Sequence, residues 1–302
     1  MPGLFYQPTS RRKFLTGASK ALAAAGLAGA VGRWPDGARA DDAAALRVGL
    51  LSDTHIAANL KDGFRKFVPW DNLQTVLPQV TATNPDWIIL NGDAARLTGE
   101  TADYEALRRA LAPVAERTPI YLGLGNHDHR ERFLQVFPQT AVARQNVVTK
   151  FVFMVERPWI RFLILDSLFV TNQTAGLLGK AQRTWLAEYL KTSDARNTVI
   201  FVHHTLGDGD GELLDAERFF EVIRPHKKVK AVFYGHSHVY SFSQRNGAHL
   251  INLPAVGYNF ADGEPVGWVD AKFSATGVTL QLRALGGNRV DDGKVTTLEW
   301  LS

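Results

Sequence analysis

Five short apolar segments of this chain each end in side chains that could bind a metal ion. The segments and their polar ends are Leu46 to Ser52 with Asp53-Thr54-His55, Trp87 to Leu90 with Asn91-Gly92-Asp93, Ile120 to Leu124 with Gly125-Asn126-His127-Asp128, Val199 to Val202 with His203-His204, and Val229 to Tyr234 with Gly235-His236-Ser237-His238. Carboxylate and imidazole groups suit iron, manganese and zinc. The chain has no cysteine, which excludes disulfides and thiolate metal sites. These residue types favour a metal-dependent reaction.

Each fragment has an ordinary explanation when it is taken alone. An isolated Gly-Asp pair is usually a turn, and a lone histidine is more often a structural residue than a ligand. Five fragments in this order, each after an apolar segment, favour one shared site. In an open α/β sheet the carboxyl ends of the strands share one edge, where ligands bind. We expect the five polar ends to meet at that edge.

The elements that would position these residues are typical of a layered α/β domain. From Leu46 onward, β-branched segments alternate with amphipathic stretches. Besides the five segments above, Arg161 to Leu165 is predicted to be a strand. The predicted helices are Asp71 to Thr83, Ala102 to Arg117, Arg130 to Gln139, Lys180 to Thr192 and Leu213 to Pro225. Gln244-Arg245-Asn246-Gly247 and Ala275-Thr276-Gly277 predict hairpin turns. No linker marks a second domain, so we expect one domain over residues 41–302.

The first 40 residues have the pattern of an export signal. Ser10-Arg11-Arg12-Lys13-Phe14-Leu15 precedes an Ala/Gly/Leu stretch, Ala18 to Val31, which is too short and too weakly apolar for a stable membrane anchor. Ala38-Arg39-Ala40 then offers small residues to a signal peptidase. The arrangement resembles a twin-arginine signal peptide. We expect the twin-arginine translocase and signal peptidase as partners during export, and a periplasmic or secreted product; an amphipathic helix with two chance arginines is the alternative.

The charge of the chain does not favour binding to nucleic acid. Residues 1–40 contain six of the 34 Lys and Arg residues but one of the 30 acidic residues, so the remainder carries a formal charge of −1. The sequence pI of about 9.3 therefore reflects the leader. A nuclease would be expected to have a basic groove, which this balance does not support.

The ordered blocks Asp-x-His, Gly-Asp, Gly-Asn-His-Asp, His and Gly-His-x-His span Asp53 to His238 and resemble the signature of the calcineurin-like metallophosphoesterase family. Within that family, Asp103-Tyr104-Glu105 and Trp185-Leu186 resemble the bacterial class III cyclic-nucleotide and glycerophosphodiester phosphodiesterases. The resemblance implies an α/β fold with a β-sandwich core flanked by helices and a dinuclear site at the strand carboxyl ends. It also implies hydrolysis of small-molecule phosphate esters, phosphodiesters above all, by a metal-activated hydroxide.

The resemblance also assigns roles to individual residues. It implies one ion held by Asp53, His55 and His238, a second held by Asn126, His203 and His236, and a bridge between them formed by Asp93. His127 would assist the leaving oxygen or stabilise the transition state. Asp128 would either orient His127 or cap the helix that begins at Arg130. His204 would support a ligand or contact the substrate, and we favour the supporting role.

Two other functions fit the same signature. A phosphomonoesterase would use the same residues, and a non-catalytic metal-binding scaffold would keep the fold without turnover. Such scaffolds lack ligands or the histidine of Gly-Asn-His, whereas all eight positions are present here. The family's double histidine is often followed by proline, but this chain continues with an acidic loop, Thr205 to Gly211. We expect that loop to border the site and to shape the substrate pocket.

Overall fold

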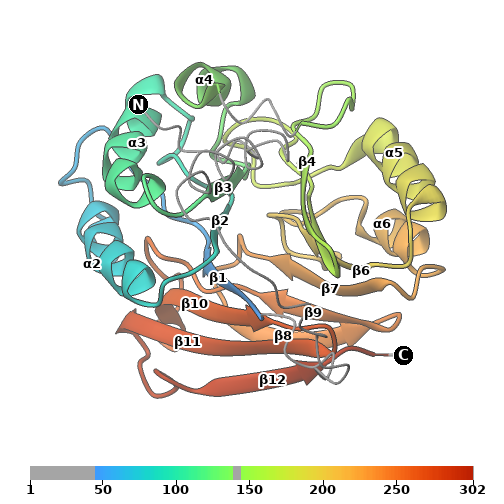
Figure 1. Ribbon diagram of the computed structural model, residues 1–302. Helices are drawn as coiled ribbons and strands as arrows, with labels where there is room; N and C mark the ends of the chain where they lie inside the picture. Colours follow the sequence, from blue (N-terminus) through green and yellow to red (C-terminus); the bar gives the residue numbers. More distant parts are fainter. Residues whose placement is uncertain (1–44, 139–143, 302) are drawn as a thin grey trace, which may run out of the picture.

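The computed structural model describes residues 45–138 and 144–301, and these form two six-stranded sheets packed face to face (Figure 1). The first sheet has the strand order β12-β11-β10-β1-β2-β3, and the second has the order β4-β5-β6-β7-β9-β8. The predicted export signal lies outside the described residues. Within the described residues, no helix has the length and apolar character needed to cross a membrane.

The strands of the two sheets have the following bounds. The first sheet contains β1 (Leu46–Leu51), β2 (Trp87–Asn91), β3 (Ile120–Gly123), β10 (Pro265–Phe273), β11 (Gly277–Gly287) and β12 (Val295–Glu299). The second contains β4 (Phe153–Arg157), β5 (Ile160–Ile164), β6 (Asn197–Phe201), β7 (Val229–Tyr234), β8 (Ser241–Arg245) and β9 (Ala248–Asn252). The six predicted strands are therefore confirmed. Both predicted hairpins are also confirmed, since β8 and β9 pair antiparallel across Asn246 and Gly247, and β10 and β11 pair antiparallel across residues 274–276.

Alternation along the strands divides the core into two apolar layers. In β6, Val199 and Phe201 belong to the layer between the sheets, whereas Ile200 belongs to the layer beneath the helices of the second sheet. Phe273 of the first sheet contacts Phe162 of the second, with 4.8 Å between ring centroids. Burial of such rings on both faces makes the sandwich a rigid support for the loops at its end.

The described residues form five helices around the sandwich. They are α2 (Pro69–Ala82), α3 (Thr101–Ala115), α4 (Arg130–Val136), α5 (Gly179–Thr192) and α6 (Ala216–Ile223). Helices α2 and α3 lie against the first sheet, and α5 and α6 lie against the second (Figure 1). The predicted bounds of two helices are wrong: α4 ends at Val136 rather than Gln139, and α6 runs from Ala216 to Ile223 rather than from Leu213 to Pro225. Phe137 precedes a proline and has left the helical region, which is disfavoured at that position. Arg224 keeps helical angles, but Pro225 after it has no N–H to continue the helix.

The sheet arrangement corrects the expectation that the polar ends share the edge of one open sheet. Strands β1, β2 and β3 are parallel neighbours in the first sheet, and β6 and β7 are parallel neighbours in the second. The predicted β-sandwich core flanked by helices is confirmed. Residues that follow the carboxyl ends of both sets must therefore meet across the end of the sandwich.

Candidate metal centre

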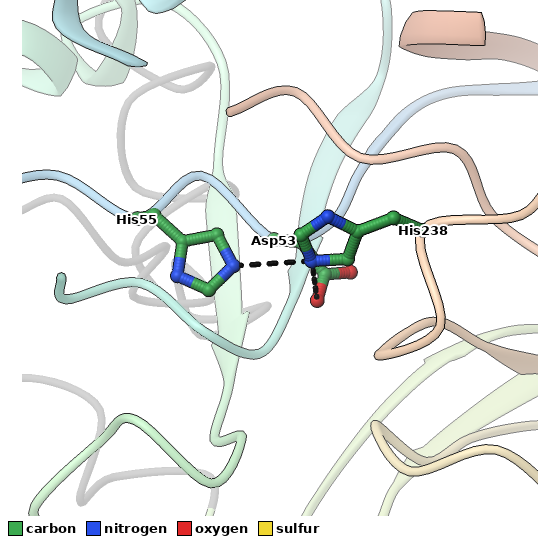
Figure 2. A group of neighbouring side chains, drawn as sticks. All are labelled: Asp53, His55 and His238. Atoms are coloured by element: carbon green, nitrogen blue, oxygen red, sulfur yellow. Dashed lines mark hydrogen bonds and ion pairs between the residues drawn. The ribbon is translucent and has the colours of Figure 1, made fainter. Parts of the chain in front are cut away.

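All seven predicted metal ligands lie together at this end of the sandwich. In one group, His238 Nε2 lies 3.3 Å from Asp53 Oδ1 and 3.2 Å from His55 Nε2 (Figure 2). Figure 2 shows the two imidazoles pointing toward each other, with the Asp53 carboxylate beside His238. His238 follows β7 of the second sheet, whereas Asp53 and His55 follow β1 of the first.

The second group adjoins the first through Asp93. Asp93 Oδ2 lies 3.3 Å from His203 Nε2 and 3.8 Å from His55 Nε2, so one carboxylate reaches both groups. His236 Nδ1 lies 2.9 Å from Asn126 Oδ1. An ion held by either group would therefore lie within reach of the Asp93 carboxylate.

The loops that carry these ligands adopt an uncommon backbone conformation. Asp53, His55, Asp93, His236 and His238 all have positive φ, between 47° and 71°. This left-handed region is sparsely populated by residues other than glycine, and it persists only where surrounding contacts hold it. Here the Asp53 and His55 amides donate to the carbonyls of Gly92 and Asp93, at 3.1 and 2.9 Å. The ligand loops are therefore fixed by each other.

Five histidines of the site each direct one ring nitrogen at a backbone carbonyl. The pairs are His55 Nδ1 with Arg96 O at 3.4 Å, His127 Nδ1 with Leu97 O at 2.9 Å, His203 Nδ1 with Asn91 O at 2.8 Å, His236 Nε2 with Gly211 O at 2.9 Å and His238 Nδ1 with Tyr258 O at 2.6 Å. A carbonyl can only accept, so each of these nitrogens carries the hydrogen. The other nitrogen of a neutral ring then offers its lone pair to the site.

The inward-facing atoms are mostly acceptors without donors. Asp53 Oδ1 and His203 Nε2 are buried and have no hydrogen-bond partner among the described residues. His236 Nδ1 and Asn126 Oδ1 face each other as two acceptors. Buried acceptors without partners are costly, and converging lone pairs repel one another. The arrangement fits two cations: Asp53, His55 and His238 would hold one, Asn126, His203 and His236 would hold the other, and Asp93 would contact both.

The electrostatics of the site also favour a bound cation. Burial alone would raise the pKa of Asp53 and Asp93, but the neighbouring imidazoles, His203 first, hold both well below the usual range. Burial opposes a proton on His203, yet Asp93 and Asp53 outweigh it and raise the His203 pKa to about 10. By contrast, burial lowers the pKa of His55 to about 3. The two buried carboxylates thus stay ionised and attract a cation.

Asp128 has a different role from the two that the sequence suggested. The Leu97 carbonyl, rather than Asp128, holds the His127 ring, and His129 is the N-cap residue of α4. The Asp128 carboxylate accepts from the amides of Gly125, Ala94 and Ala95 at 2.9 to 3.2 Å. Burial, with the charge of Asp93, raises its pKa to about 6. Asp128 therefore ties the loop after β2 to the loop after β3.

His204 lies behind the ligands rather than in front of them. Its Nδ1 is 2.7 Å from Ser167 Oγ, and its ring centroid is 4.8 Å from that of His236. Burial holds the pKa of His204 well below its ordinary value. Asp166, which had no predicted role, forms an ion pair with Arg130 and accepts from the Phe151 amide at 2.7 Å. Both residues support the walls of the site.

A cavity of about 330 Å³ opens over the ligands. It is lined by six residues named above, His55, Asp93, Asn126, His127, His236 and His238, and by six others, Thr174, Thr205, Gly211, Glu212, Ser237 and Phe260. Of these, Thr205 and Gly211 belong to the acidic loop that was expected at the rim, and Glu212 directly follows it. Thr174 and Phe260 lie in irregular segments without a motif, so no sequence signal marks them.

Gly125 gives a test of the packing beneath the ligands. A Cβ at this position would lie 2.2 Å from Asp93 Oδ1 and 2.7 Å from His203 Nε2. We expect Gly125→Ala to displace Asp93, to lower the bound metal below two ions per chain, and to destabilise the fold by roughly 1–3 kcal/mol. Metal analysis and thermal unfolding provide the measurement.

Gly263→Ala is the matched control, because a Cβ there meets no atom within 4 Å and the residue has no positive φ. It should leave both metal content and melting temperature unchanged. A Gly125→Ala protein with a full complement of metal and unchanged stability would show that Asp93 does not need this close approach.

Comparison with known proteins agrees with this geometry. The model of the calcineurin-like phosphoesterase family matches residues 46–240. A protein of Synechococcus described as a probable cyclic nucleotide phosphodiesterase is 28% identical over 237 residues, covering 76% of this chain and 88% of the relative. The glycerophosphodiester phosphodiesterase GpdQ of Enterobacter lignolyticus is 26% identical, covering 57% and 62%.

A dimetal phosphatase of Danio rerio has a similar fold, with a TM-score of 0.65 at 18% identity, covering 84% of this chain and 99% of that structure. The family match covers the strands and loops that carry every ligand described above. The chain therefore belongs to the calcineurin-like phosphoesterase family, and it is a hydrolase of phosphoester bonds with ligand groups for two metal ions.

Proposed function

We propose that this protein is a metal-dependent phosphodiesterase. The observation that carries the proposal is the composition of the cavity: metal-binding groups and the His127 imidazole line it together with one carboxylate, Glu212, that is not a predicted ligand. The names of the Synechococcus and Enterobacter relatives, both phosphodiesterases, support the same reaction class. Iron, manganese and zinc all suit the imidazole and carboxylate ligands.

Two cations at this site would lower the pKa of water and neutralise charge on the phosphoryl oxygens. Hydrolysis forms one bond from phosphorus to the water oxygen and breaks the bond to the alcohol, whose oxygen then takes a proton. His127 lines the cavity, and a ring nitrogen lies within 4.8 Å of ligand atoms of His55 and Asp93. With its Nδ1 hydrogen donated to Leu97, His127 is oriented to exchange a proton with the leaving oxygen through Nε2.

The charge at the cavity supports the proposed preference for diesters over monoesters. A monoester carries up to two negative charges near neutral pH, and a diester carries one. Glu212 lines the cavity, and Asp208 and Asp210 lie in the loop before it. Negative charge at the rim penalises the second charge of a monoester, although salt screens charges beyond about 8 to 10 Å.

We expect bis(p-nitrophenyl) phosphate to be hydrolysed at least as well as p-nitrophenyl phosphate. The comparison is made at several salt concentrations in the wild type and in Asp208→Asn/Asp210→Asn, which should raise the relative rate for the monoester. A strong monoester preference that neither salt nor the loop variant alters would refute both the diesterase assignment and its electrostatic reason.

His127→Ala should lower kcat by roughly 10² to 10⁴, the usual range for a lost general acid or base, while two metal ions stay bound. His226→Ala is a control that should retain the wild-type rate, because His226 is a half-buried residue after α6 and does not line the cavity over the metal-binding residues. Loss of metal from the His127→Ala protein would instead identify His127 as a ligand.

We further propose that residues 1–40 export the folded protein by the twin-arginine route. Arg11-Arg12 before the weakly apolar stretch supports this proposal. Replacing Arg11-Arg12 with Lys-Lys should retain the full-length precursor in the cytoplasm, because the signal depends on the guanidinium pair rather than on charge. Cell fractionation measures the outcome, and unchanged export would point to a general secretory signal.

A further inference from the structure

Among the cavity side chains that neither hold a metal nor move a proton in the proposed reaction, one is aromatic and one is a carboxylate. These are Phe260 and Glu212. They approach the cavity from the two ligand groups, since Phe260 packs against His238, and Glu212 follows Gly211, whose carbonyl accepts from His236. A substrate with its phosphate at the metals would place its alcohol group between them.

Phe260 offers an aromatic face that the fold does not cover. Its ring stacks on the His238 imidazole, with 4.2 Å between centroids and 21° between planes. The side chain is nevertheless 50% exposed. One face of the ring is thus covered by a ligand, and the exposed remainder lines the cavity. Exposure of this much apolar surface at a binding site indicates a contact with substrate.

Glu212 provides a carboxylate that is only partly satisfied. Oε2 accepts from the Gly209 amide at 3.1 Å, and this bond orders the side chain. Among residues 45–138 and 144–301, no lysine or arginine lines the cavity in which Glu212 lies. Arg96, whose carbonyl accepts from His55, is engaged with Asp62 and packs over Phe64 and Tyr258. The negative charge of Glu212 is therefore available to a ligand.

A carboxylate and an exposed aromatic face in one cavity are complementary to an organic cation. The ring quadrupole attracts a cation to the aromatic face, and the carboxylate attracts the same cation by Coulomb interaction. A neutral sugar or glycerol group would leave the Glu212 charge unused, and a second anionic group would be repelled by it. The cavity volume of about 330 Å³ exceeds what a phosphate alone would fill.

We propose that Glu212 and Phe260 form a subsite for a quaternary or primary ammonium group, so that the preferred substrates are zwitterionic phosphodiesters with a cationic amino alcohol. This proposal rests on the diesterase activity proposed above and identifies the part of the substrate that gives selectivity. The ammonium group balances the single negative charge of the diester, and the ester as a whole enters the acidic cavity without net charge.

The test compares two diesters that differ in one atom. p-Nitrophenyl phosphorylcholine carries a trimethylammonium group, and p-nitrophenyl 3,3-dimethylbutyl phosphate has carbon in place of that nitrogen. We expect the wild type to hydrolyse the choline ester with a kcat/KM roughly ten-fold higher than that for the dimethylbutyl ester. This ratio combines a modest cation–π contact and a partly exposed ion pair. The preference should appear in KM and should decline as salt is added.

Glu212→Gln and Phe260→Leu should each lower this ratio several-fold, because the first removes the charge and the second removes the aromatic face while keeping apolar volume. Glu221→Gln and Phe242→Leu, at exposed positions away from the cavity, should leave the ratio unchanged. Circular dichroism and metal content verify that all four variants fold.

The outcomes separate this proposal from the proposed activity. If neither diester is hydrolysed, the diesterase assignment itself is wrong. If both are hydrolysed with equal kcat/KM, the ammonium subsite is refuted and the diesterase assignment stands. If thymidine 5′-(p-nitrophenyl) phosphate is preferred, and Phe260→Leu but not Glu212→Gln removes that preference, then Phe260 binds a nucleobase and the cation proposal is overturned.

Discussion

The site depends on hydrogen bonds from histidine rings to main-chain carbonyls. Each of the five histidines donates one N–H to a carbonyl, and this bond decides which ring nitrogen faces the metals and in which direction its lone pair points. Four rings turn Nε2 inward, and His236 turns Nδ1 inward. If these carbonyls were displaced, the same residues would no longer present converging lone pairs. The position of the main chain therefore controls the chemistry.

The sandwich holds that main chain in place. The accepting carbonyls belong to both sheets: Asn91 is the last residue of β2 in the first sheet, and Gly211 and Tyr258 follow β6 and β9 of the second. Aromatic contacts between the sheets, such as Phe273 with Phe162, keep the two sets of strand ends together. The left-handed backbone at Asp53 and His238 is unfavourable in isolation, and the buried core offsets that cost.

The sequence was sufficient to predict which residues gather at the site, but not how they are held. A polar residue after an apolar strand is visible in the sequence, so Asp53, His203 and their partners could be identified. Every residue has a carbonyl oxygen whatever its type, so the partners of the histidine rings could not be identified from the sequence. The division of the strand ends between two sheets, and the position of Phe260, depend on tertiary packing of the C-terminal strands. Local spacing suggested that Asp128 orients His127 or caps a helix, whereas its hydrogen bonds reach residues up to 34 positions away, which spacing does not reveal.

The use of carbonyls means that the orientation of a histidine does not depend on which side chain stands at the position that orients it. A carbonyl is present whatever the side chain is, so Leu97, Tyr258 and Gly211 can be replaced without loss of the atom that orients a histidine, provided that the backbone keeps its path. Leu97 is 44% exposed, and Gly211 lies in the acidic loop at the rim. The loops around the cavity are therefore free to change their surface chemistry while the metal-binding geometry stays constant. Substrate preference in this architecture can diverge at the rim, one side chain at a time, above an unchanged reaction centre.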